Sequence, residues 1–127
     1  MKLEREMMRG AGPAAVLQLL SDGEMYGYQI VETLEQRSKG VFTLGQSTLY
    51  PMLYNLEAKG LIVSTNKEGP NGRERRYYRL TTAGKKRLEQ DREQWAALVK
   101  GLASLGMTRQ TSGGNLGWGD LATGALG

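Results

Sequence analysis

The stretch "GQSTLYPMLYNLEAKGLIVSTNKEGPNGRERRYYRL", residues 45–80, changes its hydrophobic period halfway along. Leu49, Leu53 and Leu56 recur at positions i, i+4 and i+7, which predicts one face of a helix that ends at Gly60. From residue 61, "LIVSTNK" is rich in β-branched residues, "EGPNG" has the chemistry of a turn, and "RERRYYRL" reads as a returning strand. The stretch therefore predicts a helix followed by a β-hairpin.

The returning strand presents two different faces, because successive side chains of a strand point in opposite directions. Residues 73, 75, 77 and 79 are Arg, Arg, Tyr and Arg, whereas residues 76, 78 and 80 run Arg, Tyr, Leu toward the expected core. The first set predicts a strongly cationic outer face.

Two further helices are predicted before this stretch. "PAAVLQLLSDG", residues 13–23, has Pro13 placed for a first helical turn and Gly23 placed to end the helix. Gly10, Gly12 and Pro13 leave open whether the preceding "LEREMM" extends that helix. "YGYQIVETLEQRSKG", residues 26–40, predicts the second helix.

A long helix is predicted from Thr81 onward, with Thr81 or Thr82 as its cap. Leu88, Trp95 and Leu102 repeat every seven residues, and Asp91, Leu98 and Leu105 occupy the intermediate positions. This near-heptad seam predicts pairing with a second helix. Residues 106–127 contain seven glycines and predict a flexible tail.

The predicted order gives a mainly α (α+β) fold, a winged helix-turn-helix with a two-stranded wing. The expected domains are a DNA-binding domain over residues 1–80, a C-terminal dimerisation helix over 81–105 and the tail over 106–127.

The amino-acid composition limits the classes of function that are open to this protein. The chain of 127 residues carries 17 Lys and Arg against 13 Asp and Glu, a net charge of +4, which mildly favours a polyanionic partner. Cysteine and histidine are absent, which removes the commonest metal ligands and the commonest general base. We therefore expect no metal, no cofactor and no catalytic residues. No signal sequence or membrane span is recognisable, so a cytoplasmic protein is expected.

Four segments in this order, "YGYQI" (26–30), "TLYPML" (48–53), "LEAKGLI" (56–62) and "GRERRYYRLTTAG" (72–84), resemble the PadR family of bacterial transcriptional regulators. The resemblance covers roughly residues 7–105, and the single C-terminal helix is similar to the short branch of that family. It implies a homodimeric repressor that binds double-stranded operator DNA. It also implies a small aromatic or phenolic effector that releases the DNA.

The helix-turn-helix pattern predicts that the second helix of the pair enters the major groove by its N-terminal residues. These are Gln46, Ser47, Thr48 and Tyr50. Arg73 and Arg75 are expected to contact DNA from the wing. For Arg76, a DNA contact and an ion pair with an acidic neighbour are both open.

Two compatible roles are predicted for the last helix, in dimerisation and in ligand binding. Its dimer interface is expected to contain the residues of the seam, namely Leu88, Trp95, Leu98, Leu102 and Leu105. Trp95 also corresponds to a tryptophan that, in the short branch, stacks on flat aromatic ligands between subunits.

The alternative to a DNA-binding regulator is a winged-helix protein-interaction module that has lost specific DNA readout. Tyr54 and Asn55 stand where the family usually has basic residues, and Glu74 stands where the wing often has arginine. For Tyr26, Gly27 and Tyr28, close packing of helices is favoured over a phosphate contact. Trp118, in the tail, is expected to be exposed.

Overall fold

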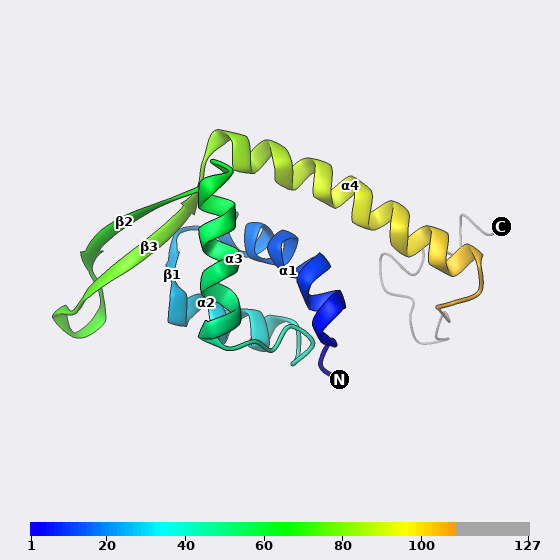
Figure 1. Cartoon of the computed structure of the whole chain (residues 1–127), viewed down its shortest axis with the longest axis horizontal. Helices are drawn as coiled ribbons and strands as arrows, with labels where there is room; N and C mark the ends of the chain where they lie inside the picture. Colours follow the sequence, from blue (N-terminus) through cyan, green and yellow to red (C-terminus); the bar gives the residue numbers. More distant parts are fainter. Residues whose placement is uncertain (109–127) are drawn as a thin grey trace. The chain divides into compact units, whose positions relative to one another are not determined.

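The computed structural model describes residues 1–108, and the predictions for Trp118 and for the tail beyond residue 108 lie outside that range. The helices and strands follow one another as α1 (Arg5–Leu20), β1 (Met25–Tyr26), α2 (Gly27–Arg37), α3 (Gln46–Ala58), β2 (Ile62–Glu68), the 3-10 turn η1 (Pro70–Gly72), β3 (Glu74–Leu80) and α4 (Thr82–Ser104) (Figure 1). The expected mainly helical winged helix-turn-helix with a long C-terminal helix is confirmed. Two compact units are present, Met1–Glu89 and the part from Gln90 onward.

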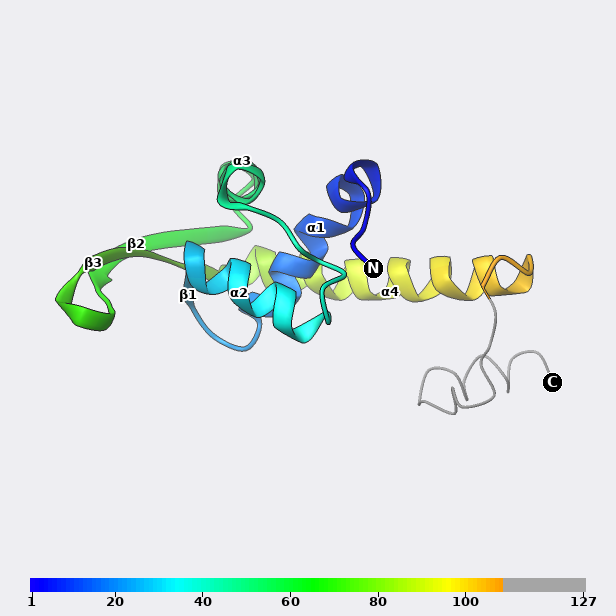
Figure 2. The same ribbon diagram turned by 90° about the horizontal axis from the view of Figure 1, so that it is seen from below.

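The first helix corrects the sequence prediction. Pro13 lies inside α1 rather than in its first turn, because α1 begins eight residues earlier, at Arg5. Proline has no N–H group to donate to the carbonyl of Arg9, and the helix bends along its length (Figure 2). The N-terminal turns form nevertheless because Met8 and Gly12 are buried, and such tertiary packing outweighs intrinsic helix propensity.

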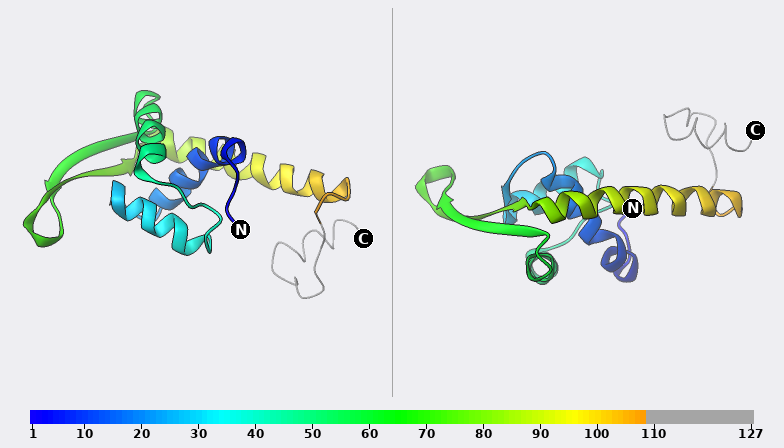
Figure 3. Two further views of the ribbon diagram at one scale, coloured as in Figure 1. Left: turned by 60° about the horizontal axis from the view of Figure 1, so that its bottom comes forward. Right: turned by 90° about the horizontal axis from the view of Figure 1, so that it is seen from above.

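The sheet has three strands where two were predicted. The β2–β3 hairpin is antiparallel, with Ile62 opposite Leu80 and Glu68 opposite Glu74. The two-residue strand β1 pairs with the other edge of β3, placing Tyr26 opposite Tyr77. A strand this short gives no period in the sequence, and the hairpin partner β3 supplies the hydrogen bonds that define it. The hairpin extends away from the three helices α1–α3 (Figure 3).

The core of the first unit lies between the helices and the base of the hairpin. Leu49, Leu53 and Leu56 are all buried, which confirms the predicted inner face of α3. Tyr78 and Leu80 are buried as predicted, whereas Arg76 remains exposed on the same strand. Burial raises the pKa of Tyr78.

The start of α4 is fixed by an anchored cap. The hydroxyl of Thr81 accepts a hydrogen bond from the N–H of Gly84 at 2.9 Å and donates one to the carbonyl of Gly60 at 2.6 Å. The N–H of Thr81 is bound to the carbonyl of Leu61. Thr81 is therefore the N-cap residue, one of the two predicted.

Candidate nucleic-acid interface

The N-terminal half of α3 presents an uncharged polar surface. Gln46, Ser47, Thr48 and Tyr50 are all exposed, as are Pro51, Tyr54 and Asn55 farther along. From residue 46 to residue 55 this helix contains no ionisable cation or carboxylate. Amides and hydroxyls of this kind bind base edges and phosphates, so this surface is suited to reading DNA.

Tyr50 is held against the start of α2. A Cβ atom added to Gly27 would collide with the hydroxyl of Tyr50, so only glycine permits this approach. This agrees with the close-packing interpretation of Gly27. The packing prediction is wrong for the neighbouring Tyr28, which is exposed, and the carboxylate of Glu32 raises its pKa.

Glu57 connects the far end of α3 to the hairpin. One carboxylate oxygen accepts a hydrogen bond from Ser64 of β2 at 2.7 Å, and the other lies 3.5 Å from the guanidinium of Arg76 on β3. Of the two alternatives left open for Arg76, the ion pair is therefore present. These contacts set the orientation of the wing relative to α3.

Arg75 is the most constrained of the wing arginines. Its guanidinium lies 4.6 Å from the ring centre of Tyr26, and that ring meets Tyr77 edge to face at 5.3 Å. The Nε of Arg75 is buried and has no hydrogen-bond partner among the described residues. The short strand β1 thus supplies a stacking platform for the arginine, a role that the sequence did not suggest.

Arg73 and Lys67 differ in their freedom. Arg73 is exposed, just beyond η1, and enters none of the ion pairs found within residues 1–108. Lys67 is engaged twice, in an ion pair with Glu24 and above the ring of Tyr77. Of these two cations, Arg73 is therefore the one with more freedom to reach a partner.

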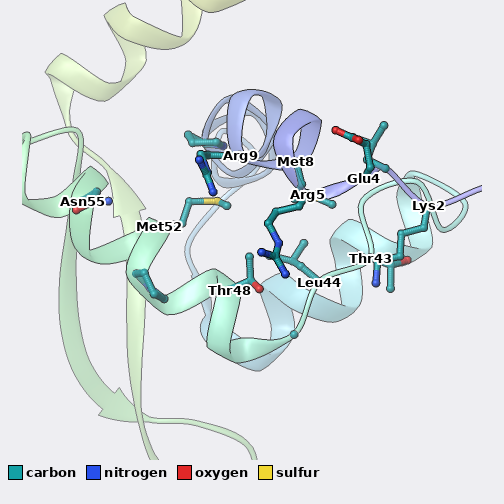
Figure 4. A pocket seen from close by; sticks show the side chains of 14 residues that line it. Lys2, Glu4, Arg5, Met8, Arg9, Thr43, Leu44, Thr48, Met52 and Asn55 are labelled. Atoms are coloured by element: carbon teal, nitrogen blue, oxygen red, sulfur yellow. The ribbon is translucent and has the colours of Figure 1, made fainter.

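A groove of about 1010 Å³ separates the N-terminal turns of α1 from α3. Thr48, Pro51, Met52 and Asn55 line one wall (Figure 4). The N-terminal segment contributes a set of charged residues, Lys2, Glu4, Arg5 and Arg9. These cations were not predicted as site residues, because the sequence leaves open whether a helix precedes Pro13. The i, i+4 spacing of Arg5 and Arg9 was the available signal.

The second part of α4 and Leu105, the residue that follows it, expose apolar side chains. Trp95, Leu98 and Leu105 of the predicted seam are 36%, 46% and 83% exposed, and Leu102 is partly buried. Leu88 is buried in the core of the first unit. The structure therefore gives Leu88 a packing role within its own chain, and a role in a dimer interface stays a prediction for all five residues.

Among residues 1–108 no group of carboxylates is arranged to hold a metal ion. No helix in the same range is long and apolar enough to cross a membrane.

The geometry is that of a winged-helix DNA-binding protein, with a polar helix beside an arginine-bearing hairpin. The sequence model of the transcriptional regulator PadR-like family matches residues 16–90. The chain belongs to this family of transcriptional regulators.

Individual relatives agree with this assignment. A transcriptional regulator of Mycobacterium tuberculosis is 35% identical over 96 residues, which cover 76% of this chain and 86% of the relative. A PadR family regulator from Eggerthella lenta, solved by crystallography, has a TM-score of 0.68 and 34% identity and covers 82% of this chain and 88% of its own. Bacillus subtilis PadR, solved in complex with operator DNA, has a TM-score of 0.58 and 29% identity, covering 63% of this chain and 45% of PadR.

Proposed function

We propose that this protein is a homodimeric repressor that binds a pseudo-palindromic operator through α3 and the β2–β3 wing. The observation that carries the proposal is the uncharged polar face of α3 beside exposed and stacked arginines of the wing. Gln46, Ser47 and Thr48 are suited to base edges, where a glutamine amide pairs with adenine in two hydrogen bonds. Tyr50, Arg73 and Arg75 are suited to the DNA backbone.

The stacking of Arg75 on Tyr26 supports a backbone contact. An arginine already held in one orientation loses less conformational freedom when a phosphate binds it. Arg76 has a carboxylate partner in Glu57, so its contribution to DNA binding is expected to be smaller than that of Arg73.

Dimerisation through α4 follows from the apolar side chains at positions 95, 98, 102 and 105, spaced as in a coiled coil. A dimer would place two α3 helices in successive major grooves, about 34 Å apart.

The direct test is a fluorescence-anisotropy titration against duplex DNA from upstream of the gene and against a scrambled duplex, at two salt concentrations. Tight, salt-sensitive preference for the upstream duplex, with two chains bound per operator, is expected. Weak and equal binding to both duplexes would favour the alternative, a winged-helix interaction module. That alternative is supported by Tyr54, Asn55 and Glu74, which stand where the family usually has basic residues.

Replacing Arg73 with alanine should weaken binding to operator and scrambled duplex alike. Removal of one phosphate contact lowers the slope of log K against log salt by about 0.9. The same titrations over a salt series measure this slope. Lys86→Ala, which removes an equal charge from the exposed surface of α4, should leave it unchanged. A loss confined to the operator would contradict a backbone contact.

We further propose that a flat aromatic effector stacks on Trp95, which is 36% exposed in α4. Planar cationic or phenolic compounds should quench the fluorescence of Trp95 and reduce DNA binding at the same concentrations. Trp118 is the second tryptophan of the chain, so the measurement uses Trp118→Phe protein. Quenching that persists in Trp95→Phe protein would place the effector elsewhere.

A further inference from the structure

The N-terminal segment carries cations that the functional assignment so far leaves unused. Lys2, Arg5 and Arg9 line the groove between α1 and α3, together with one carboxylate, that of Glu4. None of the three cations takes part in an ion pair within residues 1–108, whereas Arg37, Lys67 and Arg76 each have a carboxylate partner. The groove therefore has an uncompensated positive charge.

The structure holds these cations beside α3. Met8 is buried between Arg5 and Arg9, and the N–H of Leu3 donates to the carbonyl of Val41 at 3.1 Å. At Gly12, α1 approaches α3 so closely that an added Cβ would lie 2.7 Å from the terminal carbon of Met52. In Figure 4 the side chains of Arg5 and Arg9 extend from α1 toward α3.

The groove and the wing lie on opposite flanks of α3. Tyr50 contacts α2, and Glu57, seven residues later on the same side of α3, contacts the hairpin. Met52, in contrast, contacts α1. Positions 50 and 52 are about 200° apart around a helix. Figure 2, which looks nearly along α3, shows the hairpin on one side of this helix and the N-terminal turns of α1 on the other.

We propose that Arg5 and Arg9 bind DNA phosphates on the flank of the recognition helix opposite the wing. A helix in the major groove has a sugar-phosphate strand on each side, since the groove is only about 12 Å wide. Thr48, Pro51 and Asn55 line the groove and also belong to the exposed surface of α3, so the cations adjoin the surface that faces the bases. α3 itself supplies no cation between residues 46 and 55, and α1 supplies the charge in its place.

This inference rests on the proposed DNA-binding function, and its test separates the two. The double variant Arg5→Gln/Arg9→Gln is titrated with operator and scrambled duplexes over a salt series. Loss of two phosphate contacts should lower the salt slope by about 1.8 and weaken binding to both duplexes by roughly 10- to 60-fold near 0.1 M salt.

The matched control is Lys85→Gln/Lys86→Gln, which removes the same two charges from exposed positions on α4, so the net charge falls from +4 to +2 in both proteins. This control should keep a slope close to that of the wild type. Arg5→Lys/Arg9→Lys protein should also keep the wild-type slope of log K against log salt. That result would show that the slope depends on the two charges and not on the packing of α1. Circular dichroism of each variant establishes that α1 remains folded.

Equal slopes for the wild type and the Arg5→Gln/Arg9→Gln variant would overturn the inference while leaving the recognition helix and wing in place. Equal loss in the Lys85→Gln/Lys86→Gln control would also overturn it, since net charge alone would then be responsible. Absence of salt-sensitive DNA binding by the wild-type protein would instead overturn the proposed function.

Discussion

Gly84→Ala protein is expected to unfold with a free energy about 1–3 kcal/mol lower than that of the wild type. Gly84 is buried in the first turn of α4, and an added Cβ would overlap the carbonyl oxygen of Leu61. That carbonyl cannot move freely, because it accepts the hydrogen bond from the N–H of Thr81. The new methyl group must therefore displace backbone at the junction of hairpin and helix.

Urea denaturation followed by circular dichroism measures this loss. Gly10→Ala is the matched control, because Gly10 is also helical but has no neighbouring atom within 4 Å of an added Cβ. Alanine is favoured over glycine inside a helix by about 1 kcal/mol, so this control should be at least as stable as the wild type. Gly84→Ala protein with wild-type stability would show that Gly84 does not need the close approach to Leu61.

Tyr54→Lys protein is expected to bind any duplex about tenfold more tightly near 0.1 M salt, and Tyr54→Glu protein more weakly than the wild type. Tyr54 is 73% exposed and lies seven residues beyond Ser47, on the same surface of α3. A cation at this place would add a charged phosphate contact to a surface that has no cation of its own between residues 46 and 55, whereas a carboxylate would be repelled.

A salt series with operator and scrambled duplexes measures the change. The slope of log K against log salt should steepen by about 0.9 in the Tyr54→Lys protein. Tyr54→Gln protein, which is uncharged, should keep the wild-type slope and so separates charge from loss of the aromatic ring. If the lysine and glutamine proteins have the same slope, residue 54 does not face phosphates and the proposed docking of α3 is wrong.

The hydrophobic period and the turn chemistry of the sequence were sufficient to predict the fold class of the first unit. The spacing of Leu49, Leu53 and Leu56 predicted the inner face of α3, and the change to β-branched residues after Leu61 predicted the hairpin. Both signals are local, since they depend on which side chains must be buried within one element. They also predicted the polar residues at the start of α3, which the structure finds exposed.

Only the tertiary structure decided which distant residues meet. β1 exists because β3 offers it a hydrogen-bonding edge, and only then does Tyr26 lie beneath Arg75. The N-terminal turns of α1 form despite Gly10, Gly12 and Pro13 because Met8 and Gly12 are buried, and this brings Arg5 and Arg9 to α3. The sequence by itself determined the elements and their polar surfaces, because periodicity is a local property. The partners of the arginines were decided by contacts between residues far apart in the chain, which no local pattern contains.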